Sequence, residues 1–351
     1  MTVMNAGNSL HALGWRPHFE AQSEPAAGGR PARVLGVHRG RIDVAHERGE
    51  ESIGLSGKAA DLGLTVGDWV LLDPDAPIVR ARLEPLTLFR RRAPGTGGTV
   101  QRIAANVDTL FVVTSANRDF NVARLERYLA IAQEAGVFPV IVITKTDLVE
   151  SADDFVAAAS RLLPGVLVES LDARCPEDVE VLRPWCAEGQ TVALLGSSGV
   201  GKSTLVATLT GERLATRPVR EDDQRGRHTT TARSMHRLGQ GGWLVDTPGM
   251  RELQLVEVGE AIDDVFAEVA ELARGCRFAD CAHEAEPGCA VRAAIEAGAL
   301  DADRLRRYRK LRAEDRRNTE TLAERRSRDR SLGKLYRSIL ADKRFEKGGK
   351  P

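Results

Sequence analysis

The sequence has little of what membrane-spanning or secreted proteins require. No stretch of its 351 residues approaches the roughly 20 consecutive apolar residues that a membrane-spanning helix needs. The N-terminus also lacks the basic and then apolar segment of a secretion signal. The chain has only five cysteines, an odd number that does not favour a framework of disulfides. We therefore expect a cytosolic protein that makes no contact with a membrane.

The length exceeds that of one typical domain, and the 42% hydrophobic content is ample for more than one core. We expect two or three domains. Residues 1–30 mix Gly, Ala, Pro and Asn without a sustained apolar period, which predicts a mobile tail. Residues 31–92 contain short β-type runs separated by turns, a spacing typical of a small barrel. These runs are Val34–Val37, Arg41–Ala45, Ser52–Leu55 and Trp69–Leu72.

A linker is predicted after the barrel, at Arg90–Arg92 and Pro94–Gly98. Beyond it, apolar strands alternate with helical periods, which predicts an α/β domain with a largely parallel sheet over residues 93–254. The expected strands are Thr109–Val113, Val137–Ile143, Val166–Val168 and Thr191–Leu195, and the expected helices are Val122–Ala135 and Ala152–Leu163.

The strongest local signal is the sequence GSSGVGKS at Gly196–Ser203, between an apolar run and a helical one. Its glycines let backbone N–H groups turn toward a phosphate, Lys202 can reach the terminal phosphates, and Ser203 can ligate Mg²⁺. The N-terminus of the following helix adds partial positive charge. We expect this phosphate loop to bind a nucleoside triphosphate through Gly196, Ser197, Ser198, Gly199, Val200, Gly201, Lys202, Ser203 and Thr204.

A second signal, Asp246–Gly249, ends a later apolar run, 43 residues after Ser203. A nucleotide hydrolase needs an aspartate near Mg²⁺ at such a strand end, and a glycine whose N–H meets the γ-phosphate. We assign these roles to Asp246 and Gly249. The polar segment 225–231 between the two signals contains three threonines, and we predict Thr230 as a further Mg²⁺ ligand.

The sequence TKTD at Thr144–Asp147 indicates which base is bound. An aspartate accepts hydrogen bonds from N1–H and the exocyclic amine of guanine, a donor pair that adenine lacks. A chance surface turn is the alternative, but the tetrad caps a buried run, and no second such pattern follows Gly249. Thr144 stands where asparagine is usual, which would weaken contacts to the phosphate loop. The expected base-binding residues are Thr144, Lys145, Thr146 and Asp147.

The cysteines gather in one place. Cys276, Cys281 and Cys289 lie within fourteen residues and beside His283. Three thiolates and one imidazole are the donor set of a closed, structural zinc site, which has no open position for a reacting water. Unligated buried thiols are the alternative.

The order of the motifs is unusual, because the base-recognition tetrad precedes the phosphate loop. Together with GRHTTT at 226–231, DTPGMRE at 246–252 and the cysteine cluster, this order resembles the RsgA/YjeQ family of circularly permuted GTPases, which assist assembly of the small ribosomal subunit. The resemblance covers roughly residues 34–311. It implies an N-terminal OB-fold at 31–92, a permuted GTPase domain at 93–254 and a zinc-binding helical domain at 255–351. It also implies GTP or GDP, Mg²⁺ and one structural Zn²⁺ as cofactors.

The residue that orients the attacking water is less evident. Met250 occupies the position where many small GTPases have glutamine, and a thioether cannot orient water as an amide does. His228 lies in the segment expected to close over the γ-phosphate, and imidazole can hydrogen-bond water. We predict His228 as a catalytic residue with Lys202 and Thr230. The alternatives are that His228 contacts rRNA or packs within its loop.

The net charge of zero hides a division along the chain. Residues 301–351 hold 18 Lys and Arg against 9 Asp and Glu, whereas the first 300 residues hold 32 and 41. The C-terminal segment is thus a candidate for binding rRNA phosphates, together with the barrel and Arg90–Arg92. The alternative is a solvated helix with i,i+4 ion pairs. The basic positions are Arg304, Arg306, Arg307, Arg309, Lys310 and Arg312.

We expect a monomeric GTPase that binds the small ribosomal subunit and is stimulated by it. Two other classes stay open. An ATP-dependent transporter or metabolic kinase is disfavoured by Asp147 and by the lack of a second-substrate site. A nucleic-acid-binding module with a degenerate GTPase is disfavoured by the intact Lys202, Ser203, Asp246 and Gly249.

Overall fold

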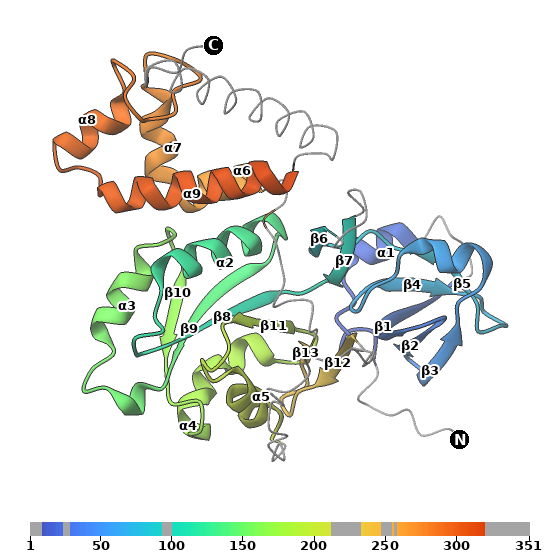
Figure 1. The fold of residues 1–351 in the computed structure, drawn as a ribbon. Coiled ribbons are helices and arrows are strands. Elements are labelled where there is room, and N and C mark those ends of the chain that lie inside the picture. The colour runs from blue at the N-terminus through green and yellow to red at the C-terminus, as the bar shows by residue number, and fades with distance from the viewer. Residues whose placement is uncertain are drawn as a thin grey trace, which may run out of the picture.

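The computed structural model describes residues 9–23, 29–92, 100–211, 233–246, 255 and 258–319. Figure 1 shows three parts: a strand-rich part containing β1–β5, a central sheet flanked by helices, and a group of helices, α6–α9, that lies over α2. No helix within the described ranges is long and apolar enough to cross a membrane.

The strand-rich part is a curved antiparallel sheet in the order β3-β2-β1-β4-β5. Its strands are β1 (Arg30–His38), β2 (Arg41–His46), β3 (Gly49–Gly54), β4 (Trp69–Leu72) and β5 (Val79–Arg82), with the short helix η1 (Gly57–Leu62). Apolar residues at alternate positions, among them Val34, Ile42 and Val70, form its own core. The strands predicted from the β-type runs are confirmed, and β5 is an additional one.

The central sheet continues from β1 through β12 (Arg233–Arg237) into five parallel strands. Their order is β10-β9-β8-β11-β13, with bounds β8 (Thr109–Ser115), β9 (Phe138–Thr144), β10 (Leu167–Ser170), β11 (Thr191–Gly196) and β13 (Trp243–Asp246). The middle strands are buried on both faces, which explains their continuous apolar runs. The predicted α/β domain with a largely parallel sheet is confirmed.

Helices cover both faces of this sheet (Figure 1). They are α2 (Val122–Glu134), α3 (Asp153–Ser160), α4 (Pro176–Val179) and α5 (Lys202–Thr210), with the 3₁₀ segments η2 (Thr146–Leu148) and η3 (Glu180–Cys186). α2 begins where the Asn121 side chain accepts a hydrogen bond from the Arg124 N–H, a normal N-cap. It lies between the sheet and the helices of the C-terminal part.

The predicted linker is wrong at its first residues. Arg90–Arg92 belong to strand β6 (Leu88–Arg92), which pairs with β7 (Val100–Ala105) in a separate two-stranded sheet. The long arginine side chains interrupt the apolar pattern, so the strand was not visible in the sequence. Residues 93–99 lie outside the described residues.

The predicted mobile tail is also wrong where the chain is described. Residues 9–23 contain helix α1 (Pro17–Ser23), and the aromatic rings of Trp15 and Phe19 pack against Trp69. The indole Nε1 of Trp243 donates to the carbonyl of Ala12 at 2.9 Å. This segment therefore connects the barrel-like part to the central sheet.

Arg33 of β1 lies at this junction with a side chain that is almost fully buried. Its guanidinium donates to the carbonyls of Leu13 and Asn106 and to the hydroxyl of Thr191, the first residue of β11. Burial lowers the pKa of Arg33 to about 10. The arginine thus stays charged near neutral pH and ties the N-terminal segment, β1 and β11 together.

The C-terminal part consists of α6 (Gly259–Val265), α7 (Ala267–Arg274), α8 (Ala290–Glu296) and α9 (Ala302–Thr319). Helix α9 packs on α6 and faces α2, where Arg304 and Arg307 both donate to the carboxylate of the fully buried Glu126. The ring of Phe266 lies 4.1 Å from the Arg304 guanidinium carbon. These contacts fix the helical part on the central domain.

Candidate nucleotide and metal sites

The sheet topology brings the two predicted nucleotide loops together. The phosphate loop follows β11 and the tetrad Thr144–Asp147 begins at the last residue of β9, and both strands run parallel to β8, which lies between them. Since the carboxyl ends of parallel strands meet at one edge of a sheet, loops far apart in sequence become neighbours there. Asp246 ends β13 at the same edge.

The phosphate loop has the backbone that its glycines predict. Gly199 and Gly201 have φ values of 79° and 91°, a left-handed conformation that favours glycine. The Lys202 ammonium donates to the carbonyl of Gly196 at 2.7 Å and also to that of Ser197, so it lies across the mouth of the loop. Ser203 and Thr204 are exposed in the first turn of α5. This cradle of N–H groups and one ammonium suits a bound polyphosphate.

Thr144 joins the two loops directly. Its buried hydroxyl lies 2.6 Å from the carbonyl oxygen of Val200 in the phosphate loop and 3.0 Å from that of Thr114 in β8. The same side chain approaches Gly201 so closely that an added Cβ there would lie 3.2 Å from its Oγ1. Threonine at this position therefore makes a contact to the phosphate loop, and the expectation that it is weaker than an asparagine contact stays a prediction.

Asp147 lies in the following 3₁₀ turn, where Lys145 has a φ of 61°. Its Oδ2 is 2.7 Å from the Arg174 guanidinium, which also contacts Asp172. The hydrogen bonds from Arg174 lower the pKa of Asp172, and the two carboxylates raise that of Arg174. No sequence motif identifies Arg174, which follows β10 and lies 27 residues after Asp147 in the chain.

A second missed contact comes from α2. Arg124 donates from its guanidinium to the Ser197 hydroxyl in the phosphate loop. No sequence signal identifies this arginine, because the two positions are 73 residues apart. It gives the phosphate loop a side-chain contact on the α2 side.

Several predicted site residues cannot be placed. His228, Thr230 and Gly249 lie outside the described residues, as do Met250 and the rest of 212–232 and 247–254. Their roles stay predictions.

The predicted metal ligands lie together. The donor atoms of Cys276, Cys281, His283 and Cys289 are all within 4.8 Å of one another. Cys276 Sγ is 3.9 Å from Cys289 Sγ and 3.6 Å from His283 Nδ1, and Cys289 Sγ is 3.5 Å from the same nitrogen. A tetrahedral zinc ion with its usual bond lengths places two sulfurs about 3.8 Å apart and a sulfur and a nitrogen about 3.6 Å apart. The residues present therefore fit such an ion, and the sulfurs are too distant for a disulfide.

The cluster joins otherwise separate elements. Cys276 follows α7, and Cys289 is the N-cap of α8, where its sulfur accepts from the Arg292 N–H at 3.5 Å. An ion at this place would hold the ends of both helices and the loop between them.

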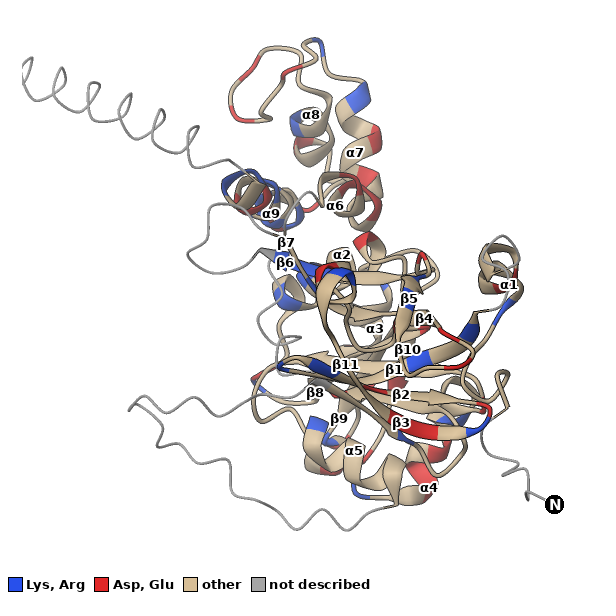
Figure 2. Cartoon of the chain, turned by 90° about the vertical axis from the view of Figure 1, so that its right-hand side faces the viewer, with Lys and Arg blue, Asp and Glu red and all other residues tan. Residues whose placement is uncertain are grey.

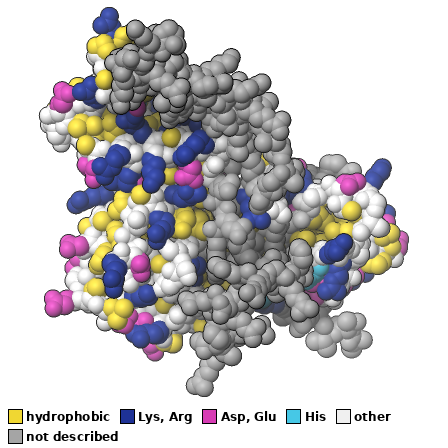
Figure 3. All heavy atoms as spheres, in the orientation of Figure 1, with side chains coloured by type: hydrophobic (Ala, Val, Ile, Leu, Met, Phe, Trp, Pro, Cys, Tyr) yellow, Lys and Arg dark blue, Asp and Glu magenta, His cyan; other side chains and the backbone are white. Residues whose placement is uncertain are grey.

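The prediction that the basic residues of α9 face rRNA is wrong for two of them. Figure 2 shows Lys and Arg positions in blue along the ribbon of α9, and Figure 3 shows dark blue basic side chains in the region of α9. Yet Arg304 is only 7% exposed and Arg307 is bonded to Glu126, so these two serve the fold and do not face an RNA. Most ion pairs formed by α9 residues are with residues outside this helix, whereas a solvated helix would form i,i+4 ion pairs within itself. Arg309 contacts Glu284, and Arg312 lies 3.7 Å from Asp263.

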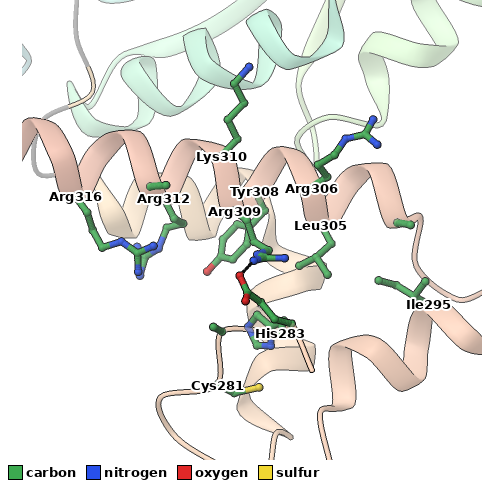
Figure 4. Close-up of a pocket in the computed structure, with 14 residues that line it drawn as sticks. Cys281, His283, Ile295, Leu305, Arg306, Tyr308, Arg309, Lys310, Arg312 and Arg316 are labelled. Atoms are coloured by element: carbon green, nitrogen blue, oxygen red, sulfur yellow. Dashed lines mark hydrogen bonds and ion pairs between the residues drawn. The ribbon is translucent and has the colours of Figure 1, made fainter. Parts of the chain in front are cut away.

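The outer side of α9 borders a groove of about 720 Å³ (Figure 4). The loop of the cysteine cluster forms the facing wall, with Cys281, His283 and Glu284. The cations along the groove are Arg306, Arg309, Lys310, Arg312 and Arg316. This surface carries more positive than negative side chains and can attract a polyanion.

Comparison with known proteins gives consistent matches. The model of the RsgA GTPase family matches residues 84–256. A protein of Vibrio parahaemolyticus named small ribosomal subunit biogenesis GTPase RsgA 2 is 47% identical over 346 residues, which cover 98% of this chain and 96% of that protein. The small ribosomal subunit biogenesis GTPase RsgA of Mesorhizobium japonicum is 50% identical over 322 residues, which cover 90% of this chain and 93% of that protein.

Solved structures agree on the fold. The crystal structure of YjeQ from Thermotoga maritima matches with a TM-score of 0.60 and 25% identity, over 80% of this chain and 96% of that one. YloQ, described as a circularly permuted GTPase, matches with a TM-score of 0.57 and 22% identity, over 84% of this chain and 97% of that one.

Proposed function

The chain belongs to the RsgA family of circularly permuted GTPases, and from this premise we propose that it binds the small ribosomal subunit, assists its late maturation and hydrolyses GTP faster when bound to it. The observation that carries the proposal is the contact between Thr144 and Val200. It joins a base-recognition loop to a phosphate loop that follows it in the chain, as a permuted GTPase requires.

We assign the nucleotide contacts as follows. The loop 196–204 holds the phosphates, with Lys202 on the terminal ones, and Asp147 accepts the two donors of guanine. Mg²⁺ would be held by Ser203 and Thr230 with Asp246 nearby, and it would neutralise charge on the phosphates. His228 would orient the attacking water, and the Gly249 N–H would meet the γ-phosphate.

We propose that the donor set of Cys276, Cys281, His283 and Cys289 holds one structural Zn²⁺. The interatomic distances given above support zinc, and four protein donors leave no position for substrate. The division into a barrel at 31–92, a GTPase domain at 93–254 and a zinc domain at 255–351 is part of the same proposal, and β1 pairs with strands of both the barrel and the GTPase domain.

Metal analysis tests the zinc assignment. The purified chain should contain about one zinc ion per molecule, and Cys289→Ser should lose it together with thermal stability, since structural zinc contributes to folding. Cys175→Ser is the matched control, because Cys175 lies outside the cluster, and this variant should keep its zinc. A wild-type chain without zinc, or a Cys289→Ser variant that retains it, would contradict the assignment.

The proposed partner is the rRNA of the small subunit. The groove beside α9 offers one positive surface, and Arg90 and Arg91 of β6 lie on a separate part of the molecule. Phosphate contacts from such surfaces would make the binding sensitive to salt. We further propose a monomer that works in the cytoplasm, where its partner matures.

Steady-state GTP turnover with and without purified small subunits tests the function. Subunits should raise turnover, because the bound state completes the catalytic arrangement, and Lys202→Ala should abolish the increase. His228→Ala should still bind GTP but lose the stimulated hydrolysis. Turnover that does not respond to subunits would favour the alternative, a nucleic-acid-binding module with a weak or degenerate GTPase.

A further inference from the structure

Arg174 links the guanine-recognition carboxylate to a second carboxylate. It follows β10 in the turn 171–174, and its guanidinium lies 2.7 Å from Asp147 Oδ2 and 2.9 Å from Asp172 Oδ2. Its Nε also donates to Asp172 Oδ1 at 3.1 Å. One guanidinium is therefore shared by two carboxylates, of which one belongs to the proposed base site.

Asp172 holds Arg174 through more hydrogen bonds than Asp147 does. It accepts bonds from the Arg174 side chain on both oxygens and from the Arg174 backbone N–H at 3.0 Å, which makes a local turn. Its own N–H donates to Asp178 Oδ2 at 3.1 Å. The Arg174 side chain is 64% exposed, so it can leave Asp147 without breaking any core contact while Asp172 still holds it.

Guanine recognition needs the carboxylate that Arg174 contacts. The base presents N1–H and an amine to the two oxygens of one aspartate. In this structure one of these oxygens, Asp147 Oδ2, is bonded to Arg174, and part of the negative charge that guanine would use is already neutralised. Binding of the base must therefore replace an existing charge-assisted contact.

Resting on the proposed guanine site, we propose that Arg174 is an affinity-determining residue that competes with guanine for Asp147. It weakens binding of GTP and GDP and speeds release of GDP. Asp172 acts as the alternative partner that receives the arginine when guanine occupies Asp147. The division of Arg174 between the two aspartates thus sets the nucleotide affinity.

Two substitutions should change GDP affinity in opposite directions. Arg174→Ala removes the competitor, and GDP should bind about two- to fivefold more tightly with slower release, the range expected for a partly exposed ion pair. Asp172→Asn keeps an oxygen for the Arg174 N–H but removes the competing charge, so Arg174 should stay on Asp147 and GDP should bind more weakly. Isothermal titration with GDP measures both effects, and melting temperatures report whether either variant is misfolded.

Arg183→Ala is the matched control. Arg183 is 67% exposed and forms a local ion pair with Glu180, away from Asp147, so its removal should leave GDP affinity unchanged. Higher salt should shrink the difference between wild type and Arg174→Ala, because the contact is partly exposed to solvent. Weaker or unchanged GDP binding by a folded Arg174→Ala variant would overturn the proposal.

Measurements on the Asp147→Asn variant distinguish a failure of this inference from a failure of the proposed guanine site. That variant should prefer xanthosine diphosphate over GDP, and adding Arg174→Ala should then have no effect, because the carboxylate for which the arginine competes is gone. If the Asp147→Asn variant keeps its preference for GDP, both the proposed guanine site and the proposed competition of Arg174 with guanine are contradicted. If the preference changes but Arg174→Ala does not tighten GDP binding in the wild-type background, only the competition fails.

Discussion

Single side chains join the parts of the nucleotide site. Thr144 is the clearest example, because its hydroxyl lies within hydrogen-bond distance of Val200 and Thr114, which belong to two different segments. The sequence marked Thr144 as a departure from the usual asparagine, and this departure proved compatible with the contact. A short hydroxyl suffices here because Gly201 lets the phosphate loop approach closely.

Replacing Thr144 tests this contact. Thr144→Val keeps the shape but removes the buried hydroxyl that contacts the carbonyl oxygen of Val200, and losing one partner of a buried hydrogen bond costs about 1–3 kcal/mol. We expect GDP to bind several-fold more weakly in a nucleotide titration. Thr144→Ser keeps the hydroxyl and should bind GDP nearly as the wild type does. Equal affinity of the Val and Ser variants would show that the hydroxyl is not needed.

The sequence predicted the residues that share a motif and missed those that act across the fold. Gly196–Thr204 and Thr144–Asp147 could be proposed from the sequence because the chemistry of phosphate and base binding constrains neighbouring positions. Arg124 and Arg174 were not, since each contacts a partner that only the folded sheet brings near. The four proposed metal ligands could be grouped from the sequence because they lie within fourteen residues, and the structure places their donor atoms together.

Helices and strands were likewise predictable only where the local sequence has a clear pattern. Continuous apolar runs predicted β8, β9 and β11, since strands buried on both faces leave no polar positions. Strand β6 carries three arginines, and α1 is a short helix with one buried residue, so neither produced a periodic signal. Helix α9 was predicted as a basic surface, yet part of its charge is used inside the protein, at Glu126.

The junction of α9 with α2 allows a prediction about stability. Glu126→Gln removes the buried carboxylate that Arg304 and Arg307 share and leaves Arg304 paired with the partly exposed Glu268, and removing one partner of a buried pair costs about 3–5 kcal/mol. We expect a lower melting temperature and faster proteolysis between the GTPase domain and α9.

Glu314→Gln provides the comparison on the same two helices. Glu314 pairs with Arg127, but both side chains are partly exposed, so its loss should cost no more than about 1 kcal/mol. Equal melting temperatures for the two variants would contradict a structural role for the buried cluster.

In the whole molecule, α2 lies between the nucleotide site and the C-terminal part. Arg124 contacts the phosphate loop, and Glu126 holds α9, only two residues further along the same helix. The chain also passes from β13 into the C-terminal helices, so two connections lead from the nucleotide to the proposed ribosome-binding surface. Such connections can transmit a change of nucleotide state, provided that the two states differ in these contacts.

The central claim is that residues 144–147 recognise the base of the nucleotide held by a loop that follows them in the chain. The most direct test is the affinity of wild type and Asp147→Asn for GDP and for xanthosine diphosphate. Guanine carries an amine donor that needs an acceptor from the protein, whereas xanthine carries a carbonyl acceptor at the same position, which the amide N–H of asparagine can meet. The Asp147→Asn variant should therefore lose affinity for GDP by at least about tenfold and gain affinity for xanthosine diphosphate. Unchanged preference for GDP would contradict the account.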